Sequence, residues 1–101
     1  MVIKVAVRVH GGEQWVWYHC PGCKQLHGVP SERWHWNGSL EAPTLSPSVR
    51  HYIPADEGRP EKTTCHYHVR DGKIEYCGDC DHELKGQTVG MIEPSGVPDN
   101  T

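Results

Sequence analysis

The sequence predicts a small all-β domain, either a β-sandwich or a rolled antiparallel sheet, stapled by one zinc site. Short stretches of alternating apolar and polar residues are separated by turns that contain Gly, and cysteines occur in two groups far apart in the chain. The chain has 101 residues, of which 36% are hydrophobic and none is Phe. A core of this size is small, so we expect a metal or another cross-link to stabilise it.

The first two strands are predicted from clean alternation. Residues 3–9 alternate apolar and polar side chains, Gly11-Gly12 is a hairpin turn, and residues 13–19 form the second strand. The large aromatic residues are four tryptophans and four tyrosines, and we expect the four tryptophans to take the place of Phe in the core. These residues are Trp15, Trp17, Trp34 and Trp36.

Two further hairpins are predicted from turn residues. Asn37-Gly38 and Asp71-Gly72 are both strong two-residue turn signals. The Asp71-Gly72 turn places one apolar set of side chains on the core face, because side chains alternate along each strand. This set is Cys65, Tyr67, Val69, Ile74 and Tyr76. Residues 43–48 include two prolines and are not expected to form a central strand, because proline lacks an N–H donor.

We expect one zinc-binding β domain at residues 1–93 and a frayed tail at 94–101. Residues 54–63 are polar and charged and are predicted to be a mobile loop. No secretory signal and no apolar run of about 20 residues is present, so a cytoplasmic protein that does not span a membrane is expected. The net charge of −3 and the scattered basic residues argue against nucleic acid as a partner.

The clearest motif is Cys20-Pro21-Gly22-Cys23, in which a tight turn aims two sulfurs at one point. This arrangement is typical of a zinc knuckle, which supplies two of the four ligands of a tetrahedral site. The alternative is a redox dithiol, but such a pair starts a helix, and Gly28 and Pro30 follow too soon for one. An odd count of five cysteines also favours a metal over disulfides.

The remaining ligands must come from residues 65–82. The candidates are Cys65, His66, His68, Cys77, Cys80 and His82. Pairing through the Asp71-Gly72 turn puts Cys65 on the core face and puts Cys77 on the opposite face with His66, which favours Cys65 together with Cys80. A strand bulge near Cys77 would reverse that assignment. His27 is a further candidate, either as a ligand or as a hydrogen-bonding neighbour of one.

Several ordered motifs resemble a family of small uncharacterised zinc-knuckle proteins found in bacteriophages, prophages and bacteria, often labelled ammonia monooxygenase. The matching segments are Cys20-Pro21-Gly22-Cys23, Pro43 to Ser48, Cys65-His66-Tyr67 and Asp79 to His82. Nothing in the sequence supports the oxygenase label. The resemblance implies Cys20, Cys23, Cys65 and Cys80 as zinc ligands, with His66 and His82 as neighbours, and a phage or prophage origin.

Enough thiols are present to close a zinc site, and a closed site favours a structural role over an enzymatic one. We therefore expect a small zinc-binding module that acts by binding another protein. The alternative is a zinc-dependent hydrolase with an open metal position, using His66, His82 or Asp79. A weaker alternative is a nucleic-acid-binding protein like a zinc ribbon.

Overall fold

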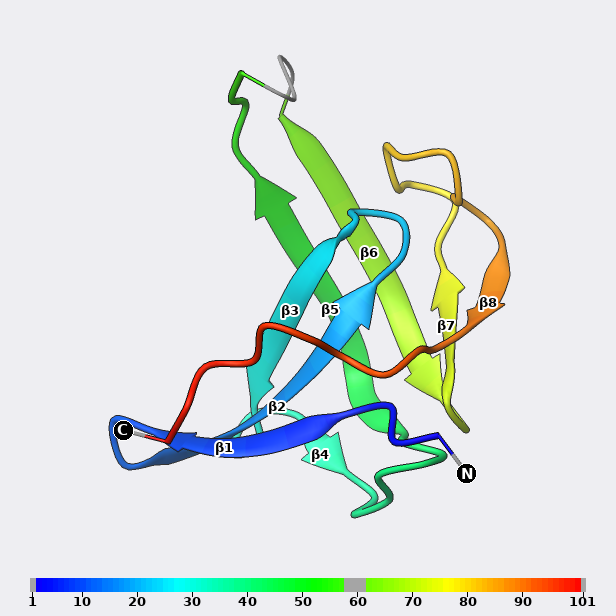
Figure 1. The fold of residues 1–101 in the computed structure, drawn as a ribbon. Helices are drawn as coiled ribbons and strands as arrows, with labels where there is room; N and C mark the ends of the chain where they lie inside the picture. Colours follow the sequence, from blue (N-terminus) through cyan, green and yellow to red (C-terminus); the bar gives the residue numbers. More distant parts are fainter. Residues whose placement is uncertain (1, 58–61, 101) are drawn as a thin grey trace.

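The computed structural model describes residues 2–57 and 62–100. Its strands are β1 (Ala6–His10), β2 (Glu13–Cys20), β3 (Gln25–Pro30), β4 (His35–Trp36), β5 (Leu45–Ile53), β6 (Thr63–Arg70), β7 (Lys73–Tyr76) and β8 (Thr88–Gly90). They form two antiparallel sheets, one ordered β1-β2-β3 and the other β4-β5-β6-β7-β8 (Figure 1). The predicted all-β class is confirmed. Among the described residues, none belongs to a helix of the length and apolar character needed to cross a membrane.

The hairpin between β6 and β7 has the predicted register. Arg70 pairs with Lys73, Val69 with Ile74 and Tyr67 with Tyr76. Asp71 and Gly72 both have positive φ, at 48° and 75°, as a tight two-residue hairpin turn requires. The apolar set that includes Cys65 and Tyr67 is buried, so the core face of this sheet was predicted correctly.

The prediction of a two-residue hairpin at Asn37-Gly38 is wrong. β4 pairs with Leu45 and Ser46 of β5, and not with the residues just after the turn. The Asn37 side chain instead organises a wider loop, because its Oδ1 accepts hydrogen bonds from the backbone N–H groups of Ser39 and Thr44, each at 3.1 Å. An Asx-type loop therefore replaces the tight turn.

The prediction that residues 43–48 do not form a central strand is wrong, because the prolines do not keep this segment out of the sheet. β5 begins at Leu45 and includes Pro47, between β4 and β6 in the strand order. The ladder to β6 is irregular between Leu45 and Val49, and the pairing to β4 stops at Ser46. Pro47 therefore lies in a bulge where no ladder bond depends on its missing N–H.

The tryptophans do not replace Phe in the core as predicted. On β2 the buried residues are Val16, Tyr18 and Cys20, whereas Trp15 and Trp17 are half-buried on the opposite face and stack with ring centroids 5.7 Å apart. Cys20 and Tyr18 lie on the same face of β2, because alternate side chains of a strand share a face. Since Cys20 is on the buried face, Trp15 and Trp17 lie on the opposite face. Trp34 and Trp36 are partly buried and pack against the core.

The β2–β3 hairpin lies across β5 and β6 (Figure 1). Buried and half-buried polar side chains join the two sheets. The hydroxyl groups of Tyr18 and Tyr67 lie 2.7 Å apart, and the rings of His27 and His51 stack with centroids 4.1 Å apart. The knuckle at the end of this hairpin is therefore held close to β6.

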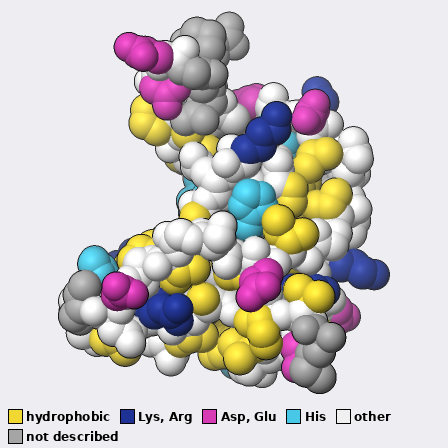
Figure 2. All heavy atoms as spheres, in the orientation of Figure 1, with side chains coloured by type: hydrophobic (Ala, Val, Ile, Leu, Met, Phe, Trp, Pro, Cys, Tyr) yellow, Lys and Arg dark blue, Asp and Glu magenta, His cyan; other side chains and the backbone are white. Residues whose placement is uncertain are grey.

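After β8 the chain runs back across the three-stranded sheet toward β1 (Figure 1), where the Asn100 Oδ1 accepts a hydrogen bond of 2.8 Å from the Val9 N–H. The domain limits at 1–93 and the frayed tail at 94–101 stay predictions. Residues 58–61 of the predicted mobile loop lie outside the described residues. Figure 2 shows basic and acidic side chains scattered over the face in view, with no basic patch.

Candidate functional site

Two groups of functional side chains lie on opposite faces of β6. Cys65 is buried and points toward the three-stranded sheet, whereas the next residue, His66, is half-buried on the other face. The alternation of side chains along the strand produces this separation. One group is rich in cysteine, and the other contains a serine, a histidine and an aspartate.

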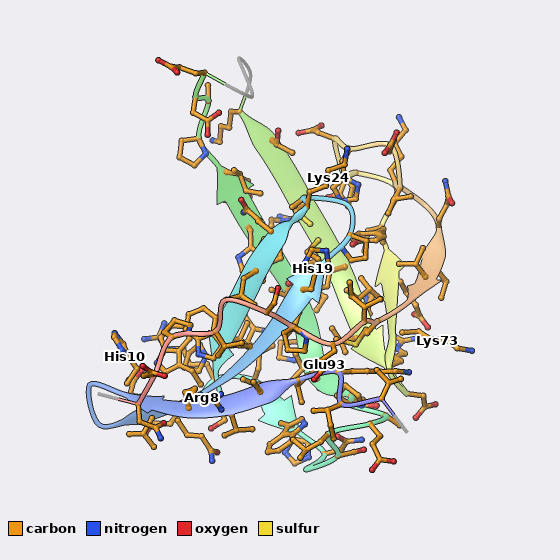
Figure 3. All side chains as sticks on the ribbon, in the orientation of Figure 1. Arg8, His10, His19, Lys24, Lys73 and Glu93 are labelled. Carbon is orange, nitrogen blue, oxygen red and sulfur yellow. The ribbon has the colours of Figure 1, made fainter. Side chains whose placement is uncertain are left out.

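The knuckle occupies the turn between β2 and β3. Cys20 is the last residue of β2, and the Cys23 N–H lies 3.4 Å from the Cys20 Sγ. The Lys24 N–H donates to the Cys20 carbonyl at 2.8 Å, and Lys24 itself has a left-handed φ of 57°. Figure 3 labels Lys24 at this turn. The backbone curls around the sulfur of Cys20. The ligand atoms of Cys20 and Cys23 lie within 4.8 Å of each other, which agrees with the prediction that this turn aims two sulfurs at one point.

Four side chains offer ligand atoms that all lie within 4.8 Å of one another: Cys20, Cys23, His27 and Cys65. The sulfurs of Cys20 and Cys65 are 3.8 Å apart. Sulfurs bound to one tetrahedral zinc ion, each at about 2.3 Å, lie about 3.8 Å from each other. The Nε2 of His27 is buried and has no hydrogen-bond partner among the described residues. A metal ion would give a partner to a buried nitrogen that otherwise lacks one.

The electrostatics of this cluster also fit a cation. Hydrogen bonds from the thiols of Cys23 and Cys65 lower the pKa of Cys20, and the Cys20 sulfur raises the pKa of Cys23 to about 12. Hydrogen bonds with Cys20 and Cys23 raise the pKa of Cys65. The three cysteines therefore do not ionise independently of one another. A divalent cation allows more of the thiols to ionise, because thiolates are the form that binds metal.

The other predicted ligands lie at the edges of this cluster. Cys80 and His82 form a group with Cys65, in which the Cys65 Sγ and the His82 Nε2 are 3.5 Å apart. The Cys80 Sγ accepts a hydrogen bond from the His66 backbone N–H at 3.2 Å and donates to its carbonyl at 2.9 Å. Cys77 belongs to a separate group with His66 and Asp79.

The second site is a chain of hydrogen bonds from Ser48 through His66 to Asp79. The Ser48 Oγ is 3.2 Å from the His66 Nε2, and the His66 Nδ1 is 3.0 Å from an Asp79 carboxylate oxygen. Ser48 lies in the irregular stretch of β5 between Leu45 and Val49, His66 is on β6, and Asp79 is in the turn after β7. This is the order of contacts in a Ser-His-Asp triad, which geometry defines and sequence order does not.

Arg50 fixes the aspartate end of this chain. It lies opposite His66 in the β5–β6 register, and its Nη2 is 3.1 Å from the Asp79 Oδ2. The hydrogen bond with His66, together with the Arg50 charge, lowers the pKa of Asp79. The Arg50 Nη2 also lies 3.2 Å from the His66 Nδ1. An ionised Asp79 is a pure acceptor and pairs with the tautomer that carries the ring proton on Nδ1, and in that tautomer Nε2 is free to accept the proton of Ser48.

Trp34 holds the serine end. Its indole Nε1 donates a hydrogen bond of 3.2 Å to the carbonyl oxygen of Ser48. Trp34 directly precedes β4, whose pairing with β5 stops at Ser46. The indole bond therefore fixes the β5 backbone at Ser48, beyond the last paired residue.

Sequence reasoning placed His66 on the polar face and named Asp79 among possible catalytic residues, but it missed Ser48. No short motif links the three residues, because they come from three separate elements. The usable signal is the spacing of the polar face: Ser48 is two residues before Arg50, which pairs with His66. That signal depends on knowing the register of β5, which the prolines obscure.

The fold and site together describe a small all-β protein with a serine–histidine–aspartate chain beside a cysteine-rich cluster. A family model described as BubE, bacterial ubiquitination-like system serine protease, matches residues 3–77. The chain therefore belongs to the BubE family. The match includes Ser48 and His66 and ends two residues before Asp79. No curated protein and no solved structure matches the chain. The family description names a bacterial system, so the phage or prophage origin stays a prediction and the ammonia monooxygenase label gains no support.

Proposed function

We propose that the protein is a serine peptidase in which Ser48 is the nucleophile, His66 the general base and Asp79 the residue that orients His66. The observation that carries the proposal is the continuous hydrogen-bonded chain from the Ser48 Oγ to the Asp79 carboxylate, with both links between 3.0 and 3.2 Å. The family description, a serine protease, supports the same reaction class.

The geometry supports the usual acyl-transfer sequence. The Ser48 Oγ attacks the carbonyl carbon of a peptide bond while its proton passes to the His66 Nε2. The same proton then goes to the leaving amine, and a water molecule, activated by His66, hydrolyses the acyl-enzyme. Asp79 keeps the ring proton on Nδ1 and stabilises the imidazolium that forms after each proton transfer.

The site lies on the face of the five-stranded sheet that points away from β1-β2-β3, so a polypeptide can reach it. The side chain of His66 is 19% exposed and that of Asp79 is 51% exposed. The protein partner expected from the sequence is, in this proposal, the polypeptide substrate. Because the family is described as part of a bacterial ubiquitination-like system, we propose a component of such a system as that substrate. A cytoplasmic location is consistent with this role and stays a prediction.

The cysteine-rich cluster has a structural role in this proposal. A zinc ion held by Cys20, Cys23 and Cys65 would tie the β2–β3 turn to β6. Cys65 directly precedes His66, the proposed general base. His27 is the favoured fourth ligand, because it belongs to the same group of four, and Cys80 is the alternative from the sequence. Zinc content separates the two: His27→Ala loses the metal if His27 binds it, and Cys80→Ser loses it if Cys80 does.

This assignment differs from the zinc hydrolase considered from the sequence. His66 and Asp79 are bonded to each other and to Ser48 and Arg50, so their polar atoms are already used in a chain that leads to a hydroxyl nucleophile. A group of four ligands, moreover, leaves no open position on the proposed zinc.

A burst assay with p-nitrophenyl acetate tests the peptidase proposal without knowledge of the natural substrate. We expect wild-type protein to release close to one equivalent of nitrophenol per chain as the acyl-enzyme forms. Ser48→Ala and His66→Ala should abolish the burst. Ser46→Ala is the matched control, because Ser46 is on the same strand but is exposed and pairs with His35 of β4. A burst that survives in Ser48→Ala would rule out Ser48 as the nucleophile.

A further inference from the structure

We propose that His66, Cys77 and Asp79 form a second, inhibitory metal site for zinc-like divalent ions, distinct from the buried cysteine cluster. The inference rests on the proposed function, because it assigns a regulatory ligand to the same histidine. Each of the three side chains offers one ligand atom, and these atoms all lie within 4.8 Å of one another.

The backbone brings these ligands together on the open face of the sheet. The Cys77 N–H donates to the His66 carbonyl at 2.9 Å, which places the two residues side by side at the end of the β6–β7 ladder. Asp79 follows in the next turn, with its carboxylate 3.0 Å from the His66 Nδ1. Cys77 is half-buried and Asp79 is exposed, so an ion can enter from solvent.

The ligand types select the metal. A thiolate and an imidazole favour zinc or cadmium, whereas magnesium and calcium prefer oxygen ligands alone. Three protein ligands leave the remaining coordination to water, so binding should be weaker than at a closed group of four and reversible with a mild chelator.

Two features of the site oppose binding, and both are small enough to overcome. The Arg50 Nη2 lies 3.1 Å from the Asp79 carboxylate and 3.2 Å from the His66 Nδ1, so the guanidinium must move away when an ion binds. The side chains of Arg50 and Asp79 are 45% and 51% exposed, and exposed ion pairs of this kind contribute little stability. Burial raises the pKa of the Cys77 thiol, so the metal must displace its proton.

Metal binding would switch the histidine off. With the ion on Nδ1, the single proton of the neutral imidazole moves to Nε2 and points at the Ser48 Oγ. Nε2 can then no longer accept the serine proton, so the base is blocked. The only proton released to solvent is that of the Cys77 thiol, and no bond to substrate is involved.

The test compares wild-type protein with Cys77→Ser during zinc titration. Cys77 has no part in the proposed acyl transfer, so both proteins should give the same burst with p-nitrophenyl acetate before zinc is added. Zinc should inhibit the wild type and raise its bound metal by one equivalent over Cys77→Ser. In Cys77→Ser the half-inhibitory zinc concentration should rise at least about 10-fold, which is the loss seen even for indirect partners of a ligand. Magnesium should have no effect on either protein.

Equal inhibition of the two proteins, or equal zinc content, would overturn the second site. Failure of the proposed peptidase is recognised separately. It removes the burst from wild-type protein that holds only its structural zinc, before further zinc is added, while the difference in bound zinc still decides the inference.

Discussion

Replacing Asp79 by Asn tests the orientation of His66 directly. The His66 Nδ1 lies 3.0 Å from the Asp79 Oδ1 and 3.2 Å from Oδ2, and the Arg50 Nη2 lies 3.1 Å from Oδ2. An amide has only one acceptor oxygen. Arg50 can only donate, so it should hold that oxygen and turn the amide NH₂ toward His66. The ring proton would then sit on Nε2, facing Ser48, where it blocks proton transfer.

The expected loss follows from the exposure of the carboxylate. In serine proteases with a buried triad aspartate, the same substitution lowers kcat on the order of 10⁴-fold. The side chain of Asp79 is 51% exposed, so water screens part of its interaction with the imidazolium. We therefore expect the rate of acylation of Asp79→Asn to fall by about 10²- to 10⁴-fold, the range of a general base.

The acylation rate with an activated ester measures this loss, and Asp81→Asn is the matched control. Asp81 is in the same turn, but its carboxylate accepts a hydrogen bond of 2.7 Å from the Thr64 N–H and is not bonded to His66. Asp81→Asn should acylate within a few fold of wild type. If Asp79→Asn also acylates at the wild-type rate while its melting curve is unchanged, Asp79 does not orient the base.

Three further predictions concern the core and the metal. Removal of zinc by a strong chelator should abolish the cooperative melting transition. Structural zinc contributes about 10–16 kcal/mol of binding free energy in small domains, whereas the whole free energy of unfolding of a domain is about 5–15 kcal/mol. An identical transition in metal-free protein would refute the structural role. Tyr67→Phe should destabilise the fold by about 1–3 kcal/mol in denaturant titration. The Tyr67 hydroxyl lies 2.7 Å from that of Tyr18 and 3.0 Å from the His51 Nε2, and the substitution leaves both partners unpaired. A change below about 0.5 kcal/mol would contradict this prediction. Burial lowers the pKa of His51 to about 4, so between about pH 6.5 and 4 the unfolded chain binds a proton that the folded protein does not. The unfolding free energy should therefore fall with decreasing pH more steeply in zinc-saturated wild type than in His51→Gln. Equal slopes would show that His51 is not the cause.

The hairpin of β6 and β7 was predictable because local information determined it. Asp71-Gly72 fixes the turn, and alternation then fixes the face of every residue up to Cys65, which is buried as expected. The same alternation rule failed on β2, where both alternating sets of side chains contain large apolar or aromatic residues. Only the inward position of Cys20, a tertiary constraint, decides that Tyr18 and not Trp17 enters the core.

The cysteine-rich cluster was predictable in part, because Cys20-Pro21-Gly22-Cys23 is a local motif. The contribution of His27 depends on the β2–β3 pairing of His27 with Tyr18, which the short Gly- and Pro-bounded segment concealed. The Ser48–His66–Asp79 chain was beyond reach, because it depends on a bulge in β5 that restores pairing only from Val49 onward. A shift of one residue at that bulge would move Ser48 to the other face of the sheet.

The most direct measurement of the central claim is to locate the covalent adduct of a fluorophosphonate probe by tandem mass spectrometry. Trypsin cleavage after Arg33 and Arg50 releases one peptide that contains Ser39, Ser46 and Ser48. We expect a single adduct on Ser48, and we expect it to be lost in His66→Ala. An adduct on another residue of the folded protein, or none at all, would contradict the assignment of Ser48 as the nucleophile.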